Sequence, residues 1–173
     1  NGYGSRAATQ RLLSQIEHFQ PDVIWLHNLH GYYLNIELLF KWLKEHSQIK
    51  ILWTLHDCWA FTGHCAHFSA AKCDRWKSGC GDCPQLKAYP KTYGADHTQR
   101  NYRQKQACFT GLANLTIIVP SEWLARTVKQ SFLKEYPVEV VHNQIDKSLF
   151  KPTPSDFREP VSYTHLRAHE TRR

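Results

Sequence analysis

Three pairs of polar residues follow short apolar runs in this sequence: His27-Asn28, His56-Asp57 and His142-Asn143. An imidazole can hydrogen-bond a ligand and stabilise developing charge, and a neighbouring carboxylate or amide can orient the ring. If the chain brings the three pairs together, their side chains predict a site for a polar ligand. The simpler alternative is that these residues are polar because they meet solvent.

The second set of reactive side chains lies in residues 58–96, which we call the Cys-rich segment. Cys58, Cys65, Cys73, Cys80 and Cys83 fall within twenty-six residues, and Cys108 lies apart. The spacing of the four cysteines from Cys65 to Cys83 fits a tetrahedral thiolate site for structural zinc, with Cys80 and Cys83 in a tight knuckle. Because the segment has few aliphatic residues, a metal ion would tie its turns together.

Two other states of these cysteines stay open. Disulfides would require an oxidising compartment, which nothing else in the sequence indicates. Unligated, partly buried thiols are the other alternative, with Cys58 as a core thiol. His64 and His67 could replace a thiolate as metal ligands, although four cysteines make this unnecessary. A cysteine nucleophile is not favoured, because His56 and Cys58 are too close in sequence for their side chains to meet well.

The elements that must position these residues alternate along the chain. Apolar runs predict strands at residues 22–27, 50–56, 115–119 and 138–142, and helical periodicity predicts helices at residues 5–19, 36–43, 98–112 and 122–132. This alternation predicts right-handed crossovers and a parallel sheet, and the apolar strands predict helices on both faces. We therefore predict an α/β fold: a partial Rossmann-like parallel sheet in residues 1–146, carrying the Cys-rich segment as an insertion, and then a linker at residues 147–159.

The predicted sheet gives the polar pairs a common position. Ligands of open parallel sheets bind beyond the carboxyl ends of the strands, so the three pairs are expected on one rim. The third strand is followed by Pro120 and by Ser121, which can cap a helix whose free amides could meet an anion. Asn35 can likewise cap the helix at residues 36–43. The rim is therefore the expected location of a binding site.

The composition is basic, rich in aromatic residues and free of long apolar stretches. The formal net charge is +7 at pH 7, and the chain contains six Trp, eight Tyr and eight Phe. The aromatic content argues against disorder. The basic balance would suit an anionic partner, or it is ordinary solubilising charge, since no dense Lys/Arg run is present. No apolar stretch approaches the ~18 residues that a membrane span needs.

Sequence features at both ends lead us to expect that the chain is part of a longer protein. Residues 160–173 resemble the translation of a sequencing-library adaptor, with the match in residues 161–171, and the chain contains no Met. We therefore expect native sequence to end near Glu159 and exclude the tail from fold reasoning. Without that tail the formal charge falls to +5, because the tail supplies Arg167, Arg172 and Arg173 against Glu170.

Five motifs together resemble bacterial family 4 glycosyltransferases, in particular the cysteine-containing members associated with capsule, colanic-acid-like exopolysaccharide and O-antigen synthesis. The motifs are residues 22–35, 54–65, 80–85, 120–124 and 141–146, within a resemblance that covers about residues 5–159. The family implies a GT-B enzyme, in which two Rossmann-like domains face each other across a cleft and transfer a sugar with retention of configuration. The chain is expected to be an incomplete acceptor-side N-terminal domain, with the donor-binding domain outside it.

The resemblance also implies roles for the rim residues. His56 matches a cleft histidine that touches the acceptor or the transferred sugar, and Asp57 would orient that imidazole, bind a hydroxyl or cap a turn. His56 would position a hydroxyl more than deprotonate it, because the departing phosphate is the expected proton acceptor in a retaining transfer. The predicted acceptor-binding residues are His27, Asn28, His30, Gly31, Ser121 and Asn143. Gly31 would let the backbone approach the ligand. Gln144 stands where the family has Gly, which predicts a strained turn.

The function implied by the resemblance is sugar transfer from a nucleotide-sugar to a glycan or lipid-linked acceptor in cell-surface polysaccharide synthesis. The fragment is expected to be inactive alone. The full-length enzyme is expected in the cytoplasm or at the inner face of the membrane through a peripheral contact, with no specific nucleic-acid partner. The alternative hypothesis is a zinc-stabilised module that binds nucleic acid or protein, suggested by the basic charge, the cysteines and the aromatic residues.

Overall fold

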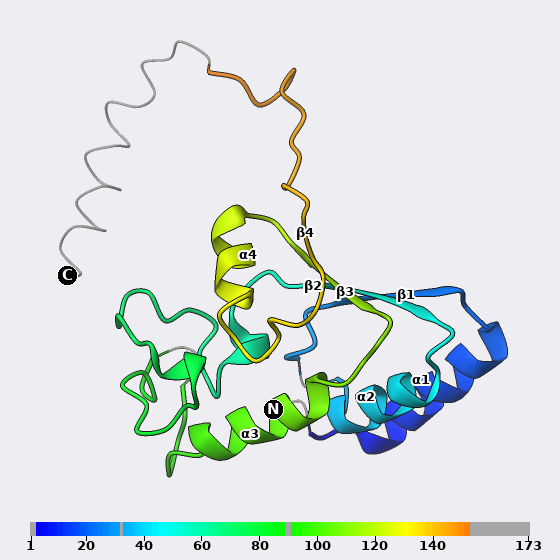
Figure 1. The fold of residues 1–173 in the computed structure, drawn as a ribbon, viewed down its shortest axis with the longest axis horizontal. Helices are drawn as coiled ribbons and strands as arrows, with labels where there is room; N and C mark the ends of the chain where they lie inside the picture. Colours follow the sequence, from blue (N-terminus) through cyan, green and yellow to red (C-terminus); the bar gives the residue numbers. More distant parts are fainter. Residues whose placement is uncertain (1–2, 32, 89–90, 153–173) are drawn as a thin grey trace. The chain divides into compact units, whose positions relative to one another are not determined.

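The computed structural model describes residues 3–31, 33–88 and 91–152, which fall into two units (Figure 1). The first unit ends at His142, earlier than the predicted domain end at residue 146, and the second begins at Asn143. Most of the expected linker, and all of the adaptor-like tail, lie outside the described residues. The elements in chain order are α1 (Arg6–Phe19), β1 (Val23–His27), α2 (Ile36–Glu45), β2 (Lys50–Thr54), η1 (Trp59–Phe61), η2 (Arg75–Lys77), α3 (Thr98–Phe109), β3 (Leu115–Val119), α4 (Glu122–Val128) and β4 (Val138–Val140).

The four strands form one parallel sheet in the order β1-β2-β3-β4, so every strand pairs with its neighbour in the sequence. One row of the sheet joins Leu26, Trp53, Ile117 and Val138 as register partners. Because all four strands run in the same direction, their carboxyl ends meet at one edge. The predicted α/β fold with a parallel sheet is confirmed.

The two faces of the sheet are buried to different extents. In β3 the burial alternates along the strand, with Ile117 fully buried and Ile118 only partly buried. In β1 the same alternation leaves Leu26 buried, while Trp25 is 59% exposed on the opposite face. Figure 1 shows α1, α2 and α3 along one side of the sheet. α2 and α3 lie on one side because right-handed crossovers between neighbouring parallel strands pass over the same face.

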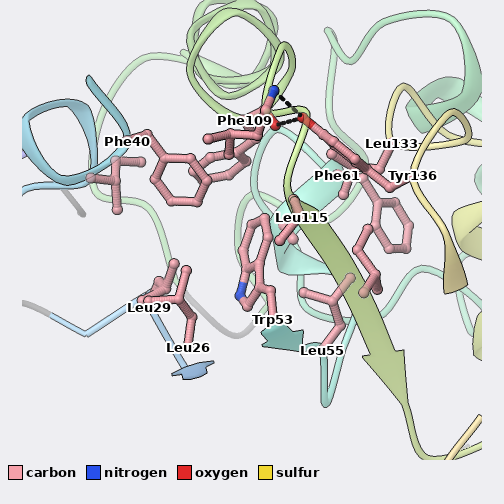
Figure 2. Close-up of a cluster of buried hydrophobic side chains, with 14 of the residues drawn as sticks. Leu26, Leu29, Phe40, Trp53, Leu55, Phe61, Phe109, Leu115, Leu133 and Tyr136 are labelled. Carbon is pink, nitrogen blue, oxygen red and sulfur yellow. Dashed lines mark hydrogen bonds between the residues drawn. The ribbon is translucent and has the colours of Figure 1, made fainter. Parts of the chain in front are cut away.

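Aromatic side chains fill the space between the buried face and the helices (Figure 2). The ring of Phe40 from α2 lies 4.6 Å from Phe109 of α3 and 5.3 Å from Trp53 of β2, measured between centroids. The hydroxyl of Tyr136 donates to the carbonyl oxygen of Phe109 at 2.7 Å and accepts from the N–H of Leu112 at 3.1 Å. Each aromatic pair adds about 0.5–1.5 kcal/mol beyond area burial. This cluster holds α2 and α3 against the sheet that carries the rim.

Capping side chains set the starts of two helices as the sequence predicts. The Oδ1 atom of Asn35 accepts from the N–H of Leu38 at 3.0 Å at the start of α2. α3 ends at Phe109 rather than at residue 112, because Thr110 is extended and Gly111 has φ +83°. A glycine in that conformation is a common helix terminator. α4 also ends early, at Val128, where the buried Ser131 hydroxyl donates to the Val128 carbonyl.

Candidate active site at the sheet rim

The polar strand exits lie on one edge of the sheet, as the sequence predicts. His27 is the last residue of β1, and His56 follows the end of β2 by two residues. His142 follows β4, and its Nδ1 atom lies 3.0 Å from the carbonyl oxygen of Pro120 at the exit of β3. Parallel pairing of all four strands therefore produces a rim with three imidazoles.

Two of these imidazoles touch. Nδ1 of His27 lies 3.3 Å from Nε2 of His56, and the stacked rings have centroids 5.6 Å apart at an interplanar angle of 25°. Both side chains are exposed, and the ring of Trp25 lies 5.2 Å from the ring of His27. One nitrogen of the contact must donate and the other accept. The other nitrogen of each ring, Nδ1 of His56 and Nε2 of His27, takes no part in this contact and can hydrogen-bond a ligand hydroxyl.

The Asp57 carboxylate does not contact the neighbouring imidazole of His56. Its Oδ2 atom lies 3.3 Å from Nε2 of His30, and its Oδ1 atom accepts from the N–H of Trp59 at 2.8 Å. Of the roles predicted for Asp57, the turn-capping one is therefore seen, and the imidazole that it orients is that of His30. Adjacent side chains diverge from the backbone, so Asp57 reaches the loop after β1 instead.

The loop after β1 is held by a side chain that sequence reasoning missed. The hydroxyl of Tyr33 donates to the carbonyl oxygen of Asn28 at 3.1 Å. A Cβ atom at Gly31 would lie 2.5 Å from the Tyr33 ring, so the ring rather than a ligand explains the small residue there. Asn28 has φ +43°, a left-handed conformation that asparagine tolerates. In the sequence, the contact between Gly31 and the Tyr33 ring is visible only as a tyrosine two positions after a glycine.

For two other predicted acceptor-binding residues, Ser121 and Asn143, the structure shows no direct sign of a binding role. The Oγ atom of Ser121 accepts from the N–H of Leu124 at 3.3 Å, so this hydroxyl is engaged as the cap of α4. Asn143 is exposed and opens the second unit, and its part in the rim stays a prediction. Gln144 is not among the described residues with positive φ, so the strain predicted for that turn is absent.

A buried lysine supports the loop after His56. Lys105 of α3 is 2% exposed, and its Nζ atom donates to the carbonyl oxygens of Trp59 at 2.7 Å and Thr62 at 2.9 Å. Nζ also lies 3.5 Å from the centroid of the Trp59 ring. Burial lowers the pKa of Lys105 to about 7, while Cys80 and Asp57 act in the opposite direction. No sequence signal identified this residue, because a lysine in a polar helix is normally exposed.

The cysteines are all free thiols in the structure. Burial raises the pKa of Cys58 to about 12 and that of Cys65 to about 11, so neither forms a reactive thiolate near neutral pH. This agrees with the sequence argument against a cysteine nucleophile. The four predicted metal ligands, Cys65, Cys73, Cys80 and Cys83, line one small cavity. Among the described residues, no group of three or more His, Cys, Asp or Glu side chains is arranged to hold a metal ion.

The fold and the rim can be compared with known proteins. The sequence model of Glycosyltransferase Family 4 matches residues 1–149. The chain belongs to this family. The match covers every predicted rim residue of this family 4 chain, from His27 to Asn143, and the Cys-rich segment.

A curated relative of the family 4 chain is named "Putative colanic acid biosynthesis glycosyl transferase WcaC", from Escherichia coli strain K12. The two are 40% identical over 74 residues, which is 40% of this chain and 18% of the relative. The family 4 chain thus aligns with less than a fifth of that protein. No solved structure matches it. In the part of the chain that the structure describes, no helix is both long and apolar enough to cross a membrane.

Proposed function

We propose that the family 4 chain supplies the acceptor side of a retaining glycosyltransferase. The full-length enzyme moves a sugar from a nucleotide-sugar to a glycan or lipid-linked acceptor in cell-surface polysaccharide synthesis. The family match supports sugar transfer, and the name of the relative supports a role in exopolysaccharide synthesis. The alternative of a nucleic-acid binding module is not proposed, because the family match spans most of the chain.

The contact between His27 and His56 is the observation that carries the proposal. Sugars present several hydroxyls, and two adjacent imidazoles offer a donor and an acceptor for them. Nδ1 of His56 hydrogen-bonds the attacking hydroxyl and holds it on the face of the donor sugar from which the phosphate departs. The departing phosphate of the donor takes the proton, so His56 acts by orientation and by stabilising charge.

The loops on either side of this pair are cross-linked, which supports a preorganised site. Asp57 joins the loop after β2 to His30 in the loop after β1. The buried Nζ atom of Lys105 donates a hydrogen bond to the carbonyl oxygen of Trp59 in the loop after β2. A site whose reacting groups are held in place before the substrate arrives loses less entropy on reaction.

The test is transfer by the full-length enzyme and its His56→Ala variant, measured as nucleoside diphosphate release from a panel of UDP- and GDP-sugars with membrane acceptors. We expect kcat to fall about 100-fold, because a mispositioned hydroxyl costs on that order. His18→Ala is the matched control, an exposed histidine on α1 away from the rim. Normal turnover by His56→Ala would overturn the site assignment. NMR of the product anomer tests retention.

We also propose that residues 1–173 alone transfer no sugar, because donor binding in a GT-B enzyme requires a second domain. The same assay, run on this chain by itself and then on the full-length enzyme, compares the two directly. Turnover by the isolated chain at the rate of the full-length enzyme would overturn this part of the proposal, whatever the outcome for His56.

The proposal includes a peripheral contact with the inner face of the membrane. It is supported by the basic balance of the chain, which has a formal net charge of +5 without the adaptor-like tail. Basic surfaces bind anionic lipids with a strength that falls with salt. Co-sedimentation of the full-length enzyme with phosphatidylglycerol vesicles, lost at high salt, is the expected result. Equal binding to neutral phosphatidylcholine vesicles would contradict it.

A further inference from the structure

A small cavity lies within the Cys-rich segment, apart from the rim. Cys65, Cys73, Cys80 and Cys83 all line it, and its volume is about 20 Å³. A cavity needs on the order of 10–15 Å³ to hold one water-sized occupant. The space therefore suits a single ion and is too small for an organic ligand.

Three side chains around this cavity contain buried polar atoms without a hydrogen-bond partner. Among the described residues, four buried side-chain nitrogen or oxygen atoms have no hydrogen-bond partner. Three of them, His64 Nε2, Trp76 Nε1 and Thr98 Oγ1, belong to residues that line the cavity. Buried polar atoms are nearly always paired, and an orphaned one marks a place for an ion or an ordered water. His64 and Thr98 also border a larger neighbouring cavity, so the four cysteines are the feature that distinguishes the small one.

Backbone N–H groups point at two of the sulfurs. The N–H of Gly63 donates to Sγ of Cys80 at 3.2 Å, and the backbone N–H of Gln85 donates to the Cys83 thiol. Burial raises the pKa of both thiols, and these hydrogen bonds act in the opposite direction by favouring a sulfur that carries negative charge. Gly63 is required for this approach, since a Cβ atom there would lie 2.8 Å from Cβ of Cys80 and would collide with the Thr98 carbonyl.

The side chain of Lys105 connects this region to the neighbouring loop. Its Nζ atom donates to two neutral carbonyls, and it interacts electrostatically with Cys80, Asp57 and Cys65. Four thiolates around one divalent cation carry two net negative charges, which would add to the negative charge near this side chain.

We propose that Cys65, Cys73, Cys80 and Cys83 bind one structural Zn²⁺ ion. Each thiol releases its proton to solvent when its sulfur bonds the metal, with no change in oxidation state. The side chains are not arranged for coordination in the structure. Binding therefore includes rotation about the Cα–Cβ bonds, the single torsion that moves each Sγ. The thiolates complete a tetrahedral set, and His64 stays a wall residue.

The zinc site is coupled to the rim through Lys105. Nζ of Lys105 bonds the carbonyl of Trp59, the N–H of Trp59 bonds Asp57, and Asp57 pairs with His30. Lys105, which interacts with Cys80 and Cys65, therefore links the metal site to the rim through contacts that the structure shows. The metal site is proposed independently of the function of the chain. An effect of the metal on sugar transfer rests on the proposed function.

Metal analysis of the purified chain under reducing conditions tests the site directly. We expect one zinc per chain and, after exchange, a cobalt spectrum with the thiolate charge-transfer and visible bands of tetrahedral sulfur coordination. A metal-free chain that stays metal-free after incubation with Zn²⁺, or disulfides detected by mass spectrometry among these four cysteines, would overturn the proposal. This measurement needs no variant, so it does not depend on how a mutant folds.

Variants identify the ligands and the coupling. Cys80→Ser is expected to lose the zinc, while Cys108→Ser keeps it, because Cys108 lies on α3 with its thiol directed to the carbonyl of Ile36. Lys105→Gln should weaken zinc binding about 10- to 100-fold, the usual range for an outer-shell partner. His64→Ala should bind zinc normally. Loss of zinc in His64→Ala with retention in Cys80→Ser would overturn the four-thiolate set.

Discussion

Nδ1 of His27 lies 3.3 Å from Nε2 of His56 although 29 residues separate them in the chain. The contact exists because β1 and β2 are adjacent and parallel, with His27 in register with Thr54. Each ring therefore restricts the orientation of the other. The pair is a structural unit of the rim, and its members should respond together to mutation.

The first prediction concerns this unit. His27→Ala removes the partner of His56 but leaves the ring that faces the acceptor, so we expect a fall in kcat of about 10-fold in the full-length enzyme. The double variant should lose less than the sum of the single losses in free energy, since contacting residues are coupled by about 0.5–3 kcal/mol. Steady-state kinetics on the four enzymes measure this. Strict additivity would show that the two rings act independently.

The second prediction separates the two bonds of Asp57. Asp57→Ala removes both the contact with His30 and the acceptor for the Trp59 N–H, and should cost about 1 kcal/mol in the free energy of unfolding. Asp57→Asn keeps an oxygen for the Trp59 N–H and should cost less. Urea unfolding of the three proteins measures the difference. Equal losses would mean that the turn hydrogen bond contributes nothing.

The third prediction uses two tryptophans on neighbouring strands. Trp53 is 2% exposed on the covered face, and Trp25 is 59% exposed on the other. Trp53→Ala should cost about 3–5 kcal/mol because it opens a cavity among aromatic rings. Trp25→Ala should cost about 1 kcal/mol, chiefly the hydrogen bond that its Nε1 donates to Thr54 at 2.8 Å. Chemical denaturation provides both values, and a reversed order would contradict the assignment of the buried face.

The fourth prediction is a pH dependence at the start of α3. Desolvation raises the pKa of the exposed Asp96 carboxyl, but hydrogen bonds from the N–H of Cys83 at 2.7 Å and from Thr98 outweigh it and lower the pKa. As pH falls toward 3.8, the usual pKa of an aspartate, the unfolded chain therefore binds the proton at this carboxyl before the folded chain does. The stability from these bonds is complete above that pH and is lost as pH falls through the folded pKa.

The variant Asp96→Asn isolates this effect. Its unfolding free energy should vary less with pH across the acid range than that of the wild type, and its stability at neutral pH should fall by about 1 kcal/mol, as for other lost helix-start acceptors. Asp74→Asn is the control, since its exposed carboxylate pairs with Lys77 at the surface. Identical acid curves for Asp96→Asn and the wild type would remove the assigned role.

The sequence by itself determined the strand and helix order, the parallel sheet and the gathering of polar exits on one rim. These follow from local patterns, because an apolar run of five residues and a 3.6-residue period report burial on their own element. Asn35 and Ser121 were also predicted as helix caps, since a cap bonds only a few residues along the chain.

Only the tertiary structure decided which side chains meet. It paired Asp57 with His30 instead of His56, brought His27 against His56, and buried Lys105 under the loop that follows them. It also left one face of the sheet less covered than the apolar strands suggested. Such partners are chosen by strand register, rotamer and the packing of distant elements. None of these leaves a periodic trace in the sequence, because contacts between distant residues are fixed only when the whole core forms.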